Sequence, residues 1–155
     1  MGYTPLEGLM MGTRSGSIDP GIMLFLARRH VTNEEMSNGL EHRAGLLGAS
    51  GTTASARDLE TQAAAGDAAA RMAIDMFDRS AAAGIAAAAT ALDRCDAIVF
   101  TGGIGQHADR IRADICRRLG VLGIGQEGGP AVLVVGARED LVIARDSASV
   151  LGLRS

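Results

Sequence analysis

The sequence has no lysine, no tryptophan and few aromatic residues: one tyrosine and three phenylalanines among 155 residues. All fifteen basic residues are arginine. The chain therefore cannot form a lysine Schiff base, anchor pyridoxal phosphate through lysine or supply the lysine of a Walker A loop. Any cation that meets a substrate must be an arginine, a protonated histidine or a bound metal.

Cysteine is also scarce, and negative charge slightly exceeds positive charge. The formal net charge of −3 argues against a general nucleic-acid binder, which normally carries a basic face. Cys95 and Cys116 are too far apart for a CxxC metal site and too few for a disulfide framework. The three histidines show no metal-ligand spacing. We therefore expect a reduced, cytoplasmic chain.

Long apolar runs are missing as well. The first residues, MGYTPLEGL, have neither the basic region nor the apolar region of a secretion signal. The most apolar stretch, residues 81–92, is dominated by alanine and is too short to cross a bilayer about 30 Å thick. We expect no membrane association.

Helix-start signals and hydrophobic periodicity predict alternating helices and strands, which indicates an α/β fold. Asp19 precedes a proline, Thr32 opens a capping box and Asp67 caps the longest helix, whose alanine-rich face predicts burial. We expect Gly39 to end the second helix. The predicted helices are 20–30, 32–39, 57–65, 67–94, 107–119 and 138–151; the predicted buried strands are 96–101 and 131–135, with a candidate strand at 121–124 and a loop at 46–56.

The strongest local signal for a ligand is the run Gly102-Gly103-Ile104-Gly105, between a strand and a helix. Glycines leave no Cβ between the backbone and a ligand, and the N-terminus of the following helix attracts anions. A phosphate or a nucleotide could bind here, but a tight turn without a ligand explains the pattern equally well. The spacing fits neither GxGxxG nor GxxxxGK[ST].

Two further segments carry charged residues that could contact a ligand. Arg14 lies between small residues, so its guanidinium could meet a carboxylate or phosphate, or it could close a salt bridge or cap a helix. Glu139 and Asp140 begin the last predicted helix. They could complement the helix dipole, or one carboxylate could reach Mg²⁺.

Taken together, these segments resemble the acetate kinase family. LEGLMMGTRSGSIDPG at 6–21 is similar to a signature of that family, and DAIVFTGGIG at 96–105 resembles its adenosine-binding segment. Shorter resemblances follow in the family's order at 45–51, 56–60, 120–124 and 139–145. The resemblance covers nearly the whole chain.

The resemblance implies an actin-like ATPase (ribonuclease H-like) fold and transfer of phosphate between ATP and acetate, giving ADP and acetyl phosphate with Mg²⁺. Arg14 would be the catalytic arginine, and Glu139 would help to hold Mg²⁺. The implied nucleotide-binding residues are Ser55, Arg57, Gly102, Gly103, Ile104, Gly105 and His107. The sequence departs from the family at Ser55, where Asp is usual, at Gln106-His107-Ala108, where Glu-Asn-Ser is usual, and at Arg138.

Family members are more than twice as long, so residues 1–155 resemble only a C-terminal portion, without the N-terminal domain and the first strands of the second. We expect an incomplete domain with a long central helix and an open sheet edge, weakly active or inactive alone, that forms a homodimer or pairs with a complementing N-terminal half. The alternatives are a propionate or butyrate kinase fragment and a non-catalytic remnant for nucleotide binding or dimerisation.

Overall fold

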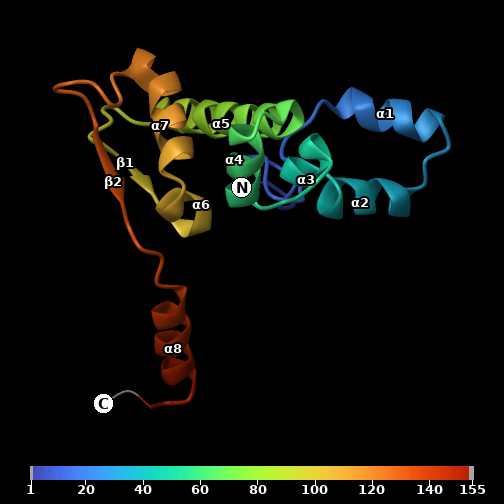
Figure 1. Cartoon of the computed structure of the whole chain (residues 1–155). Coiled ribbons are helices and arrows are strands. Elements are labelled where there is room, and N and C mark those ends of the chain that lie inside the picture. The colour runs from blue at the N-terminus through green and yellow to red at the C-terminus, as the bar shows by residue number, and fades with distance from the viewer. Residues whose placement is uncertain (1, 154–155) are drawn as a thin grey trace.

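The computed structural model describes residues 2–153, which are arranged around one long helix, α5 (Ala68–Ala89) (Figure 1). The predicted cap of this helix is confirmed, because Asp67 Oδ1 accepts hydrogen bonds from the amides of Ala69 and Ala70 at 2.8 and 3.1 Å. Satisfying these amides stabilises the helix start.

One face of α5 is buried, as its alanine-rich stretch predicted, and the other face is exposed. Met72 and Met76 on the opposite face are 52% and 46% exposed. Three helices pack on the buried side: α3 (Gly45–Ser50), α4 (Ala56–Ala64) and α7 (Asp109–Arg118). The small alanine side chains of α5 allow these helices to approach closely. The core also includes three side chains that are at most 1% exposed: Leu46, Leu59 and Ile111.

The helices α1 (Pro20–Arg28) and α2 (Asn33–His42) form a hairpin that projects from the body opposite the sheet (Figure 1). Their predicted starts are confirmed, with Asp19 as one cap and the Thr32 capping box as the other. The prediction that Gly39 ends α2 was wrong. Gly39 does not adopt a positive φ, and its carbonyl accepts the amide of Arg43, which closes the helix one turn later.

The strands β1 (Ala97–Phe100) and β2 (Ala131–Val134) pair in parallel, with Ala97 opposite Ala131. Both strands were predicted to be buried, and this was wrong. In β1 Ile98 and Phe100 are buried but Val99 is 52% exposed, while every residue of β2 is exposed. A parallel sheet normally has both faces covered. Here one face of β1 packs on the core, while within residues 2–153 the other face of β1 and the whole of β2 are uncovered.

Three other boundaries differ from prediction because tertiary contacts, which the local pattern does not display, decide them. The segment expected to be a loop at 46–56 contains α3. The candidate strand at 121–124 is the end of a 3-10 helix (Leu119–Leu122), followed by Gly123 at φ 76°. The helix predicted at 107–119 is confirmed as α7, but the glycine run before it forms a further short helix, α6 (Gly102–His107).

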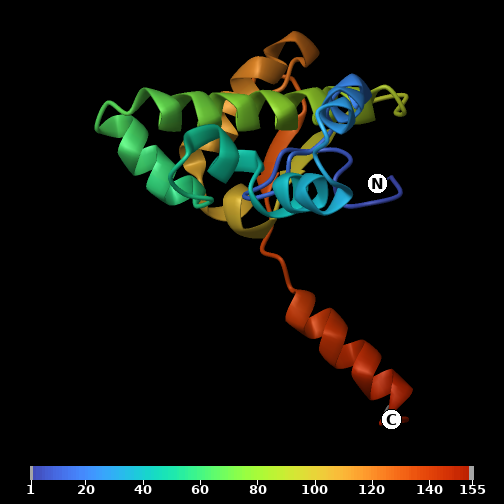
Figure 2. The same cartoon turned by 90° about the vertical axis from the view of Figure 1, so that its right-hand side faces the viewer.

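The last helix, α8 (Glu139–Val150), confirms its prediction but stands apart. Figures 1 and 2 both show it projecting away from the body after an extended link from β2. Leu141, Val142 and Ile143 are 52%, 48% and 66% exposed. Among the described residues, no helix is both long and apolar enough to cross a membrane.

Candidate functional site

Arg14 lies in a closed loop that runs from Gly8 to Ser17. The ends of the loop meet where Gly8 N donates to Ser17 Oγ at 2.8 Å and Ser17 N donates to Gly8 O at 3.0 Å. Gly16 has φ 70°, and a Cβ there would lie 2.6 Å from Met10 N. A side chain therefore does not fit at this glycine, so the loop depends on it.

The turn that carries Arg14 is held by the N-terminus of α3. Leu46 N and Leu47 N donate to the carbonyls of Met11 and Gly12, each at 2.9 Å, and Met11 N donates to Arg14 O at 3.1 Å. These contacts use helix amides that would otherwise lack partners. The turn is consequently fixed by backbone hydrogen bonds, which leaves the Arg14 side chain free of that structural task.

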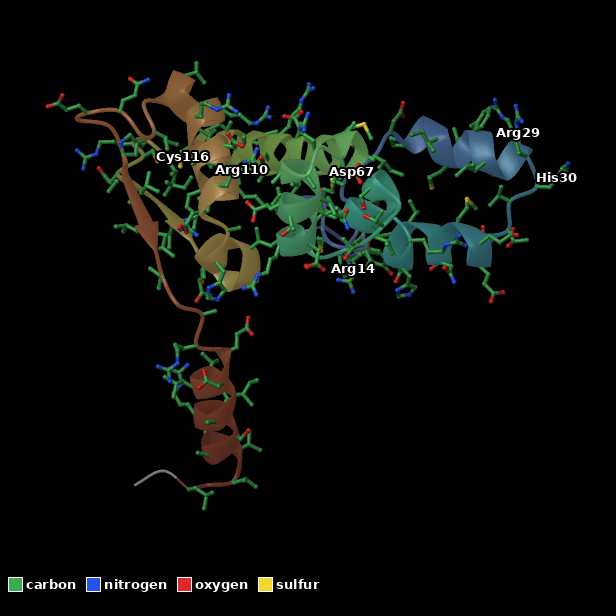
Figure 3. The ribbon with its side chains drawn as sticks, viewed as in Figure 1. Arg14, Arg29, His30, Asp67, Arg110 and Cys116 are labelled. Carbon is green, nitrogen blue, oxygen red and sulfur yellow. The ribbon has the colours of Figure 1, made fainter. Side chains whose placement is uncertain are left out.

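The guanidinium of Arg14 is a half-buried cation without an acidic partner. Among residues 2–153 it forms neither a salt bridge nor a side-chain hydrogen bond. The salt-bridge alternative is therefore not realised within the described chain. Figure 3 shows Arg14 at the lower edge of the body, beside α3 and α2. On such a fixed turn, an unpaired guanidinium can bind a carboxylate or phosphoryl group by donating two parallel hydrogen bonds.

Ser55 and Arg57 lie at the start of α4. The Ser55 hydroxyl caps this helix by accepting a hydrogen bond from Asp58 N at 3.3 Å. The Arg57 side chain is exposed and makes no hydrogen bond or ion pair with another described residue. Ser55 is thus partly engaged in the fold, whereas the Arg57 guanidinium can contact a ligand.

The glycine run 102–105 after β1, called the glycine turn below, begins the short helix α6 and has two kinds of glycine. Gly102 adopts φ 72°, which favours glycine, whereas Gly103 does not have a positive φ. A Cβ at Gly103 would meet nothing within 4 Å, and one at Gly105 would lie 3.4 Å from Phe100 C. The fold therefore explains Gly102 but does not require glycine at Gly103. Ile104 is partly buried against the core, and the His107 side chain is exposed.

The glycine turn, the start of α4 and the Arg14 loop lie on the same side of α5 in both views (Figures 1 and 2). Glu139 does not join them, because it begins α8, which projects away from the body. The structure thus groups most of the predicted site residues on one side, and it leaves the predicted metal ligand apart.

The donor set for Mg²⁺ is incomplete. Within the described residues no three His, Cys, Asp or Glu side chains form a group that could hold a metal ion. Asp140, next to Glu139, is paired with Arg138 at 3.3 Å. Glu139 is left as one exposed carboxylate in the first turn of α8, where it complements the helix dipole.

Sequence reasoning missed two side chains that support this site. The Ser80 hydroxyl on α5 accepts a hydrogen bond from Met10 N at 3.1 Å, and Arg112 on α7 donates through Nη1 to Gly105 O at 2.9 Å. Neither residue lies in a recognisable motif, and both act over a distance in the sequence that no local pattern displays. They anchor the Arg14 loop and the glycine turn to the body.

Comparisons with known proteins identify the family to which this fold belongs. The family model described as the acetokinase family matches residues 1–153, and the chain belongs to this family. The chain is 42% identical over 173 residues to the acetate kinase of Deinococcus radiodurans, covering 99% of this chain and 44% of that protein. It is also 42% identical over 170 residues to the acetate kinase of Thermosynechococcus vestitus, covering 99% and 41%.

Solved structures show the same relationship. A propionate kinase from Francisella tularensis superposes with a TM-score of 0.87 at 36% identity, over 93% of this chain and 41% of that chain. The acetate kinase of Porphyromonas gingivalis gives 0.87 at 31% identity, over 97% and 43%. The predicted family and the fold, an incomplete actin-like α/β domain with a long helix, are confirmed. The chain spans less than half the length of these relatives.

Proposed function

We propose that this chain forms one wall of an ATP-dependent acetate kinase, which transfers a phosphoryl group between ATP and acetate to give ADP and acetyl phosphate. Residues 1–155 would correspond to a C-terminal portion of such an enzyme. The observation that carries the proposal is the half-buried, unpaired guanidinium of Arg14 on a turn fixed by α3, on the same side of α5 as the glycine turn.

The side chains of this wall would bind and orient both substrates. Arg14 would contact the acetate carboxylate and the transferred phosphoryl group, where a guanidinium stabilises charge spread over the equatorial oxygens. Gly102, Gly103, Ile104 and Gly105 would line the adenosine site. Further nucleotide contacts would come from Arg57 against the base, Ser55 near the ribose and His107 beside the turn.

When bound, Mg²⁺ would neutralise charge on the ATP phosphates, and Glu139 would supply one oxygen ligand. One carboxylate does not complete a metal site, so we assign this chain no step that runs through the metal. The remaining groups would come from a complementing N-terminal half or from the rest of a longer protein. A site open on one side cannot hold both substrates in line, so we expect weak or no turnover by the 155 residues alone.

The first test is whether the 155-residue chain binds ATP, measured by titration calorimetry. A leucine at Gly103 would project into the proposed site, while an alanine at that position meets no other atom in the fold. We expect binding by the natural chain, weaker binding by Gly103→Ala and loss of binding by Gly103→Leu, with unchanged circular dichroism. No heat of binding for the natural chain would contradict a nucleotide site and would leave a dimerisation role, which sedimentation would reveal.

The second test mixes the chain with the N-terminal portion of the Deinococcus radiodurans acetate kinase, which would supply the rest of the proposed site. The formation of acetyl phosphate is then measured. We expect Arg14→Ala to lower kcat at least about 10²-fold, because it removes a group that stabilises transition-state charge. Arg43→Ala is the control, since Arg43 is exposed and its side chain has no hydrogen bond within the described residues. Equal losses in both variants, or turnover at ordinary enzyme rates by the isolated natural chain, would be inconsistent with the proposal.

A second candidate is propionate as the acceptor, favoured by the similarity to the Francisella tularensis propionate kinase over 93% of this chain. Butyrate belongs to the same series. Comparing kcat/KM for acetate, propionate and butyrate in the restored enzyme separates these acids. A preference of tenfold or more for the longer acids would replace acetate in the proposal.

A further inference from the structure

A small cavity lies where α4, α5 and α7 meet, and it is lined mainly by charged side chains. Its volume is about 60 Å³, which is large enough for a water molecule. Figure 3 shows Arg110 on the side of α7 that faces α5. The lining residues are Ala63, Arg71, Ile74, Asp75, Asp78, Arg110 and Asp114.

Asp78 is the unusual member of this group, because it is 1% exposed. It interrupts the apolar stripe of α5, where Ile74 and Ala81 lie one turn before and after it. Two buried side-chain polar atoms lack a hydrogen bond in the part of the chain that the structure describes: Asp78 Oδ1 and Arg118 Nε. An unpartnered buried carboxylate is costly, so this group favours its neutral, protonated form.

The positive charges around Asp78 compensate it only in part, because Arg118 lowers its pKa by less than burial and Asp114 raise it. Arg118 pairs with Asp75, and Arg71 donates to the carbonyl of Ala63 at 3.2 Å. Burial, followed by the negative charge of Asp114, raises the pKa of Asp78 to about 7. The charged groups that face Asp78 come from three helices: Glu60 on α4, Arg71 and Asp75 on α5, and Arg110, Asp114 and Arg118 on α7.

We propose that this cavity is a proton-binding site that links the packing of α7 on α5 to pH. Asp78 holds the proton on its carboxyl oxygen while α7 is packed. When the O–H bond breaks, the proton passes to solvent, and an unpaired carboxylate is left between the helices.

Loosening of α7 would also weaken the hydrogen bonds that hold the glycine turn. Arg112 on α7 donates to Gly105 O at 2.9 Å, and Ala108 N, ahead of α7, donates to Ile104 O at 3.0 Å. The proton site therefore lies one helix away from the turn proposed to bind nucleotide. The inference itself does not depend on the proposed function, because it concerns the packing of α5 and α7.

The sign of the pH dependence follows from the raised pKa. Between the unfolded pKa near 4 and the folded pKa near 7, the folded chain binds one more proton than the unfolded chain. Stability from this group is complete at low pH and is lost as pH rises to about 7. One extra proton corresponds to a fall in Tm of about 3–5 °C per pH unit in this range.

Asp78→Asn tests the proposal, since asparagine has the shape of the protonated acid and cannot ionise. Across pH 4 to 8.5 we expect the difference in Tm between Asp78→Asn and the natural chain to be smallest at pH 4, to grow in favour of the variant as the pH rises to about 7, and to level off above that pH. At pH 8, hydrogen exchange of the α7 amides should be slower in the variant. Asp58→Asn, which removes an exposed carboxylate from α4, should follow the natural chain throughout.

A second measurement needs no variant. The infrared band of a protonated carboxyl group should be present in the folded natural chain at pH 6 and absent at pH 8.5. Parallel Tm profiles for Asp78→Asn and the natural chain, or no protonated carboxyl band at pH 6, would overturn the proposal.

Discussion

The body around α5 buries its large apolar side chains, whereas the C-terminal segment, defined as β2 and α8, leaves its own exposed. In the body, leucines and isoleucines from α3, α4 and α7 lie against α5 with almost no exposure. In the C-terminal segment, every residue of β2 is exposed and α8 has no buried residue among those described. Both segments have strong local propensity, so propensity alone does not distinguish them.

The difference shows where this sequence is self-sufficient. In the body, the two surfaces that pack together are both present, since the alanine face of α5 and the leucines that cover it belong to the same 155 residues. For β2 and α8 the covering surface is not within the described chain. The C-terminal segment therefore leaves apolar side chains uncovered within residues 2–153.

The largest effect should come from removing a buried leucine in the body. Leu59 in α4 is 0% exposed, whereas Leu141 in α8 is 52% exposed. We expect Leu59→Ala to lower the free energy of unfolding by about 2–5 kcal/mol, because it leaves a cavity. Leu141→Ala should change it by less than about 0.5 kcal/mol. Urea denaturation measures both, and similar losses would show that α8 is packed in solution.

A smaller loss should follow from a side chain at Gly45, within the body. Gly45 has φ 63°, and a Cβ there would lie 2.1 Å from Met11 O. We expect Gly45→Ala to cost about 1–3 kcal/mol through backbone strain and to displace the Arg14 turn. Gly103→Ala is the matched control and should be neutral or stabilising, since alanine favours a helix. The comparison fails if both variants unfold at the same urea concentration.

The smallest effect concerns helix caps. Asp67→Ala removes two hydrogen bonds at the start of α5 and should cost about 1 kcal/mol of global stability. Thr32→Ala removes a similar cap from α2, a helix with no buried residue among those described. Because α2 is not part of the core, we expect faster hydrogen exchange in α2 without a shift of the urea midpoint. A shift equal to that of Asp67→Ala would place α2 within the cooperative unit.

The parts of the fold that could be predicted are those with a local cause. Asp19, Thr32 and Asp67 each start a helix through a hydrogen bond spanning two or three residues, and all three starts were predicted. The ends were less predictable. Gly39 stays helical without a positive φ, and α2 ends only at His42, before Arg43 at φ −128°, which no local signal shows.

The parts that could not be predicted depend on contacts between distant residues. The segment 45–50 is rich in small residues and resembles a loop, yet it is helical because its amides meet the carbonyls of Met11 and Gly12. The exposure of β2 also has no local signal. The sequence AVLV is typical of a buried strand, and it does not show whether a covering layer is present. The roles of Arg14, Arg57 and Glu139 remain predictions, supported by position alone. The burial of Asp78 could have been predicted, because it is an acidic residue on the apolar stripe of α5.

The projecting helix α8 also bears on the lifetime of the chain in a cell. Leu141, Val142 and Ile143 stand on an element joined to the body by an extended link. Chaperones and proteases continuously sort chains by such accessible segments. While these side chains stay uncovered, the abundance of the chain would depend on how quickly that sorting removes it.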